Sequence, residues 1–166
     1  MKYPKLNPLL ANQLSAIPPS LYDKVNYYPS SVELNSGEIL ENVLLVVAGE
    51  YYSSWGVWPH EDSSKEDINL GNIKYVFPSR NRIPLQFSQK IISYEESGMG
   101  YSLFYFVFKD GNKVLSLCGG ICDFFVLPDS YLVEDIIDVQ PFARDNNQPI
   151  VPIIKTANFY FCLYDE

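Results

Sequence analysis

The pattern of apolar and polar positions predicts a strand-rich chain built from hairpins. The segment 32–35 alternates, Ser36-Gly37 supplies a turn, and 39–47 is almost continuously apolar. The segment 101–108 is apolar and aromatic and ends at Asp110-Gly111, a dipeptide typical of hairpin turns. We therefore expect one hairpin in each half of the chain.

Short apolar runs beside turn residues predict further strands over 72–77, 121–127, 136–139, 150–154 and 158–164. The aromatic segment 51–58 is expected to extend the sheet or to form a loop. The polar, acidic segment 59–67 is expected to be a surface loop. The chain therefore alternates short strands with exposed connections.

Two short helices complete the predicted elements. Asn7 stands where a helix cap is expected, and Pro8 suits the first helical position. A second helix is expected over 84–92, because Phe87 and Ile91 are four residues apart and share one face. Together, these elements predict an α+β fold in which antiparallel hairpins and meanders dominate.

A short pattern of the form I-x-x-V-x-P occurs twice, at 73–78 and at 136–141. Each copy is preceded or opened by the tripeptide Glu-Asp-Ile, and each follows a turn-centred segment. A repeated pattern of this kind indicates a repeated structural unit, and it does not identify a reaction or a ligand. We expect a single domain over 1–166 that contains two related halves, 30–80 and 101–144.

The first hairpin carries a resemblance to a known fold. Its pattern Val32-x-Leu34-x-x-Gly37, followed by Val43, resembles the opening hairpin of Sm-like and SH3-like small barrels. The resemblance implies SH3-like or partly open barrel halves. It concerns the fold alone, because such barrels host many functions.

The charge balance limits the kind of partner. The 166 residues include 12 Lys and Arg against 20 Asp and Glu, for a net formal charge of −8. An acidic protein repels phosphate backbones, so nucleic acid is not an expected partner. Complementary charge would steer association with a basic protein, although the same charge also serves plain solubility.

The cysteines and the apolar runs indicate compartment and cofactors. The chain has three cysteines, Cys118, Cys122 and Cys162, and an odd number argues against a complete disulfide framework. Zinc takes about four N or S ligands, and His60 is the only histidine, so no metal or cofactor is expected. The chain start lacks a signal-like apolar region, and no apolar run is long enough to cross a bilayer. We therefore expect a cytoplasmic protein without membrane contact.

Three residues are candidates for an enzyme of unrecognised type, namely Asp123, Cys122 and His60. Asp123 lies within an apolar run, where a charge needs a partner, and Arg80 or Arg144 would supply one. A cysteine nucleophile needs a base, which only His60 offers. Since structural roles explain these residues more simply, no catalytic residue is assigned.

One segment has the composition of a protein-binding hot spot, because it combines exposed-type aromatic residues with carboxylates. The candidate binding residues are Tyr52, Trp55, Trp58, Glu61, Asp62, Glu66 and Asp67. The aromatic residues would equally suit a carbohydrate platform or a buried core. We call these seven residues the aromatic–acidic surface.

The stretch 94–141 resembles small uncharacterised bacterial proteins, some of which are immunity partners of secreted toxins. The resemblance rests on Asp110-Gly111, on the segment 122–128 and on the pattern Glu134-Asp135-Ile136-x-x-Val139-x-Pro141. It implies a non-enzymatic acidic protein that blocks a basic toxin by covering its surface, and it carries no site residues. A structural or assembly subunit that uses exposed sheet edges is a further alternative.

Overall fold

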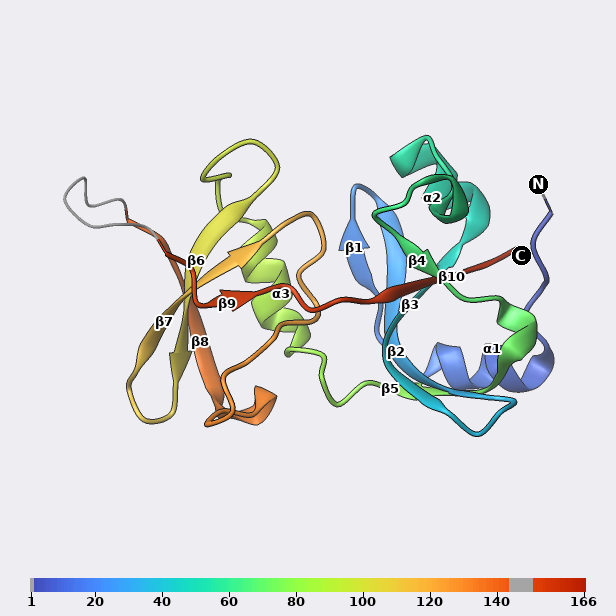
Figure 1. Ribbon diagram of the computed structural model, residues 1–166, viewed down its shortest axis with the longest axis horizontal. Coiled ribbons are helices and arrows are strands. Elements are labelled where there is room, and N and C mark those ends of the chain that lie inside the picture. Colours follow the sequence, from blue (N-terminus) through green and yellow to red (C-terminus); the bar gives the residue numbers. More distant parts are fainter. Residues whose placement is uncertain (1, 144–150) are drawn as a thin grey trace. The chain divides into compact units, whose positions relative to one another are not determined.

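The computed structural model describes residues 2–143 and 151–166, and these residues group into two compact units (Figure 1). Unit 1 comprises Met1–Asn81 and Asn158–Glu166, and unit 2 comprises Arg82–Ala157. Unit 1 is therefore assembled from two separate stretches of chain, with all of unit 2 between them in the sequence. The expectation of a single domain stays a prediction.

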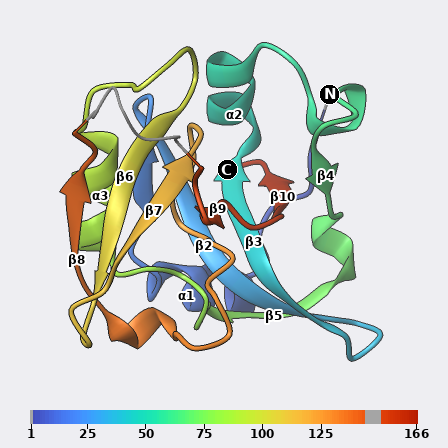
Figure 2. The ribbon, with the colours of Figure 1, turned by 60° about the vertical axis from the view of Figure 1, so that its left-hand side comes forward.

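Unit 1 is a mixed sheet with helices. Its elements are α1 (Pro8–Ser15), β1 (Ser20–Tyr22), β2 (Val25–Leu34), β3 (Ile39–Val47), α2 (Ala48–Trp55), η1 (Pro59–Glu61), β4 (Glu66–Asp67), η2 (Leu70–Asn72), β5 (Ile73–Pro78) and β10 (Tyr160–Tyr164). The strand order is β1-β2-β3-β10-β4, and β5 also pairs with β2. Strand β10 runs parallel to both β3 and β4, and Figure 2 shows it between them. The other pairings are antiparallel.

Helix α1 covers one face of this sheet. It begins where the sequence predicts, because the Asn7 side chain accepts a hydrogen bond from the Leu10 backbone N–H at 2.9 Å. Leu10 and Leu14 are buried in a cluster that also contains Val43 and Cys162. This face holds a hydrophobic core of unit 1.

Helix α2 covers the opposite face of the same sheet, which corrects the expected strand or loop over 51–58. Tyr51 is fully buried and meets the Phe161 ring edge-on, with centroids 5.0 Å apart. Trp55 donates a 2.9 Å hydrogen bond to the hydroxyl of Tyr27. Aromatic residues four positions apart suit one face of a helix, and Gly56, at φ 67°, ends it in the left-handed conformation.

The described residues of unit 2 form one α-helix, one short 3-10 helix and a four-stranded sheet. Its elements are α3 (Leu85–Ile92), β6 (Ser102–Phe108), β7 (Lys113–Cys118), η3 (Val133–Asp135), β8 (Ile136–Pro141) and β9 (Ile154–Lys155). The strand order is β8-β6-β7-β9, with only β9 parallel to its neighbour. Phe87 and Ile91 of α3 pack into a core with Phe104, Phe106 and Phe108, as the predicted helix face requires.

The segment 121–127, expected to be a strand, is irregular. It forms single bridges outside the named strands, from Phe124 to Arg82 and from Phe125 to Thr156, and Val126 donates a 2.9 Å backbone bond to Lys155 of β9. A disulfide joins Cys118 to Cys122. Residues 121–125 of this run are buried although they form no strand, so their hydrophobicity reflects burial and not strand structure.

The two I-x-x-V-x-P segments form β5 and β8, and they occupy equivalent places in the two sheets. Each pairs antiparallel with the first strand of a hairpin, so Val32 lies opposite Val76, and Phe106 opposite Val139. Each register also shifts near its end, next to Leu34 or Phe108. In both cases the central valine is buried against the core.

The equivalence extends to the hairpin turns. Gly37 and Gly111 have φ values of 88° and 85°, which strongly favour glycine. In each half, the residue that follows the first strand of the hairpin donates a backbone hydrogen bond to the residue that precedes the I-x-x-V-x-P segment. These bonds join the Asn35 N–H to the Asn72 carbonyl at 2.8 Å and the Lys109 N–H to the Asp135 carbonyl at 2.9 Å. We infer that the two halves share one supersecondary plan.

The predicted β-dominant α+β class is confirmed, with hairpins and both expected helices in place. Across the described residues there is a third α-helix, α2, beyond the two expected. Both sheets are mixed, because β9 and β10 enter in parallel. Within those residues, neither sheet closes into a barrel.

Candidate functional site

The centre of the aromatic–acidic surface is a lysine held between an indole and a carboxylate. Lys65 Nζ lies 3.6 Å from the centre of the Trp55 ring and 3.2 Å from Asp62 Oδ2. The Lys65 side chain is only 10% exposed. An ammonium over an indole face is attracted by the ring quadrupole. The surface therefore already binds one cation from its own chain.

A second aromatic group lies beside it and stays accessible. The rings of Tyr52 and Trp58 stack with centroids 4.5 Å apart, and the Tyr3 ring also contacts Trp58, with centroids 5.2 Å apart. Tyr52 is 44% exposed, while Trp58 is half-buried. Helix α2 positions Tyr52, and the turn at Gly56 brings Trp58 back against it.

The carboxylates of this surface divide into two groups. Glu61 accepts a bond from the Trp58 backbone N–H at 3.1 Å, and Asp62 bonds both the N–H and the hydroxyl of Ser64. The bonds from Ser64 are the main reason why the pKa of Asp62 lies below its usual value. Glu66 and Asp67 of β4 are exposed and, among the residues that the structure describes, make no ion pair.

Two buried hydroxyls lie near these carboxylates. Tyr3 Oη and Tyr51 Oη have no hydrogen-bond partner among the described residues. Burial, and secondarily the charges of Asp67, Glu61 and Asp165, raises the pKa of Tyr3. Burial also raises the pKa of Tyr51, so both phenols stay protonated at neutral pH.

Two of the three candidates for catalysis, Cys122 and Asp123, have structural partners. The sulfur of Cys122 is joined to Cys118, and Asp123 is fully buried with Oδ1 3.4 Å from Arg82 Nε. Among the described residues, the pairing partner of Asp123 is therefore Arg82 and not the expected Arg80. Arg80 instead binds Glu41, and Arg144 lies outside the described residues. His60 is exposed on η1 of unit 1.

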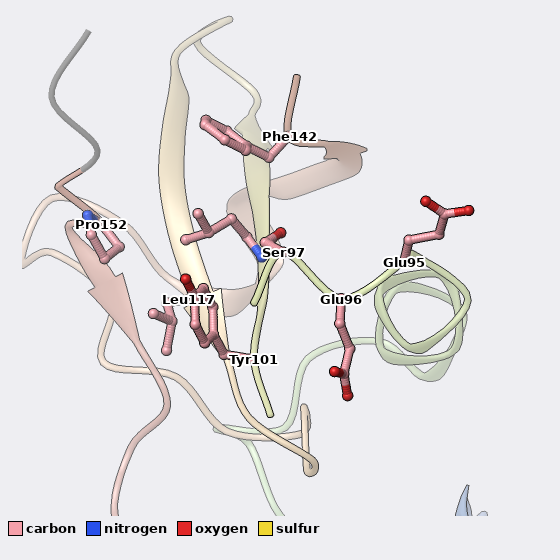
Figure 3. A pocket seen from close by; sticks show the side chains of 8 residues that line it. Glu95, Glu96, Ser97, Tyr101, Leu117, Phe142 and Pro152 are labelled. Atoms are coloured by element: carbon pink, nitrogen blue, oxygen red, sulfur yellow. Dashed lines mark hydrogen bonds between the residues drawn. The ribbon is translucent and has the colours of Figure 1, made fainter. Parts of the chain in front are cut away.

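Sequence reasoning missed a cavity in unit 2. It has a volume of about 480 Å³ and is lined by Glu95, Glu96, Ser97, Tyr101, Leu103, Leu117, Phe142 and Pro152. Figure 3 shows Leu117, Tyr101 and Pro152 on its strand side, with Glu95 and Glu96 at the margin near the end of α3. These residues are spread from 95 to 152, so no local motif could have indicated them.

Residues 2–143 and 151–166 contain no cluster of three His, Cys, Asp or Glu side chains fit to hold a metal ion. Nor, within these ranges, is any helix both long and apolar enough for a bilayer crossing. No family model, curated protein sequence or solved structure matches the chain. The site must therefore be interpreted from its own geometry.

Proposed function

We propose that the protein is a non-enzymatic binding protein that recognises a basic protein through the aromatic–acidic surface. The most specific form of this proposal is a bacterial immunity protein, located in the cytoplasm, that neutralises a basic toxin. The mechanism is steric and electrostatic blockade. It requires no catalytic residue and no cofactor.

The observation that carries the proposal is the capture of Lys65. Trp55 and Asp62 together hold the ammonium group of Lys65, whose side chain is only 10% exposed. The neighbouring Tyr52–Trp58 stack and the carboxylates of Glu66 and Asp67 offer the same chemistry. A lysine or arginine of a partner would meet an aromatic face and a nearby carboxylate there, which is the combination found in interface hot spots.

The charge of this segment favours fast encounter with a basic partner. Between 50 and 67 the chain carries five carboxylates and one lysine. Such a patch steers a cationic protein over a range set by the Debye length of about 8 Å at physiological salt. The aromatic pair then supplies contact area that slows dissociation.

The experiment compares three baits in quantitative affinity capture from the source cell. The first is the native chain, and the second is Tyr52→Ala/Trp58→Ala/Glu66→Gln/Asp67→Asn. The third, Glu38→Gln/Glu134→Gln, removes two exposed carboxylates elsewhere. We expect a basic partner whose recovery falls at least about tenfold with the second bait and stays unchanged with the third.

Co-expression then tests the immunity form of the proposal. The captured partner should stop growth when it is expressed alone, and the native chain should restore growth. Circular dichroism must show that the second bait is folded. Equal recovery of every partner by the first and second baits would remove the aromatic–acidic surface from the proposal.

A further inference from the structure

The sheet of unit 2 is apolar on both faces. The core face carries Phe104 and Phe106, so the alternating positions Leu103 and Tyr105 lie on the other face of β6. On β7, Leu117 is the register partner of Leu103 and lies on this same second face. A strand that is apolar on both sides normally has cover on both sides.

In unit 1 the equivalent second face does have a cover. Pro29 of β2 pairs with Leu44 of β3, as Leu103 of β6 pairs with Leu117 of β7. In both sheets the second strand of this pair also has a parallel neighbour, which is β10 in unit 1 and β9 in unit 2. Leu44 is fully buried because α2 packs over this face with Tyr51 inward. In unit 1, therefore, a helix that carries aromatic side chains packs on this face of the sheet.

In unit 2 the second face remains partly open. Leu103 is already buried, whereas Leu117 is half-buried, and no helix of residues 82–143 and 151–157 packs there, since α3 joins the core on the other face. The cavity of about 480 Å³ lies over Leu103 and Leu117. Ile153, which precedes β9 and donates its backbone N–H to Leu115, extends the apolar surface and is 68% exposed.

The charges around this face indicate the polarity of an occupant. Glu95 and Glu96 at its margin are exposed and, within the described part of unit 2, form no ion pair (Figure 3). Lys155, the register partner of Leu117, is exposed and offers one cation beside the strands. The margin at the end of α3 is thus complementary to a basic group.

We propose that this second face is a docking site for an amphipathic helix of a partner protein, with an aromatic side chain in the cavity and a lysine or arginine against Glu95 and Glu96. The partner helix lies over the sheet of unit 2 as α2 lies over the sheet of unit 1. The site uses residues outside the aromatic–acidic surface and goes beyond the function proposed above. It follows the helix-in-groove mode of recognition, in which anchors recur at helical spacing.

The test titrates the full-length chain, ¹⁵N-labelled, with two stapled helical peptides of about 16 residues, a length near the limit at which helices persist in water. Both carry Trp and Leu anchors on one face, and they differ only in two polar positions, which are Lys in one and Glu in the other. We expect the Lys peptide to bind at least about tenfold more tightly. Its amide shifts should centre on Tyr101, Leu103 and Leu117.

Three variants sharpen the result. Ile153→Asp places a charge on an exposed part of the face, so it should weaken the Lys peptide about tenfold without unfolding the chain. Val126→Asp is the control, since Val126 is 61% exposed and does not line the cavity. Glu95→Gln/Glu96→Gln should remove the preference for the Lys peptide over the Glu peptide.

Several outcomes would overturn this docking site. Equal affinity of the two peptides would remove the charge argument, and shifts confined to Tyr52 and Trp58 would assign the peptide to the other surface. Light scattering that shows a dimer, broken by Ile153→Asp, would make a second copy of the chain the occupant. None of these three outcomes changes the bait experiment, so the two proposals fail independently.

Discussion

Arg82 Nε lies 3.4 Å from Asp123 Oδ1, and the Asp123 carboxylate is fully removed from solvent. The Ile83 backbone N–H also bonds the Asp123 carbonyl at 3.0 Å, so this pair fastens the start of unit 2 to the irregular segment after β7. Asp123→Asn should destabilise unit 2 by about 3–5 kcal/mol, because it leaves a buried guanidinium without its counter-charge. Urea unfolding measures this loss.

The exposed pair Arg80–Glu41 is the matched control for that measurement. The Arg80 side chain is 83% exposed, so Arg80→Gln should change the free energy of unfolding by less than about 1 kcal/mol. Equal losses for Asp123→Asn and Arg80→Gln would contradict the structural importance assigned to the buried pair.

Lys65→Met should destabilise unit 1 by about 1 kcal/mol, because it removes the ammonium from the Trp55 face while keeping the length of the side chain. Indole fluorescence should shift at the same time. Lys74→Met is the comparison, since Lys74 Nζ lies farther from its ring, at 4.9 Å from the centre of Tyr75. An unchanged fluorescence spectrum with Lys65→Met would mean that Lys65 does not occupy this position in solution.

Tyr51→Phe should leave stability unchanged or raise it by up to about 1 kcal/mol, because the buried hydroxyl has no partner among the described residues. Tyr27→Phe is expected to do the opposite and cost about 1 kcal/mol, since its hydroxyl accepts the Trp55 bond. Thermal unfolding of the two variants side by side distinguishes these outcomes. A large loss with Tyr51→Phe would indicate a hydrogen bond from that hydroxyl.

The protein should lose stability in alkali, beginning near pH 9. Burial, with a smaller effect of Asp67, raises the pKa of the Cys162 thiol from its usual 9.0 to about 12. The unfolded chain therefore releases this proton first, and the free energy of unfolding falls as pH rises from about 9 to about 12. Burial raises the pKa of Tyr51 and Tyr164 as well, which steepens the loss above about pH 10.

Cys162→Ala isolates the thiol contribution to that pH dependence. Between pH 9 and 10 its unfolding free energy should fall less steeply than that of the native chain, whatever the cost of the substitution at pH 7. Chemical denaturation at each pH provides the slopes. Parallel slopes for both proteins would show that Cys162 is not protected from ionisation.

Local signals in the sequence predicted the hairpins and two helices well. The Asn7–Pro8 start and the Gly37 and Gly111 turns depend on backbone geometry that neighbouring residues determine. Helix α2 was missed because its aromatic residues favour strands, although the spacing of Tyr51 and Trp55 also suits a helix. The tertiary cover of the sheet decided between these two structures.

Contacts between distant residues were harder to predict. The segment 121–127 has the apolar pattern of a strand, but the Arg82 pairing and the Cys118 disulfide hold it in an irregular path. In the candidate site, the residues of the aromatic–acidic surface were identified, while the position of Lys65 over Trp55 was not. That contact depends on the turn through η1, which composition alone does not specify.

Strand β10 is synthesised after every residue of unit 2, yet it belongs in the sheet of unit 1 beside β3. The sheet of unit 1 therefore stays incomplete, with the β10-facing edge of β3 open, until the final strand of the described chain is available. A chain truncated after Ala157 would keep every residue of unit 2 but would leave an open, association-prone strand edge in unit 1.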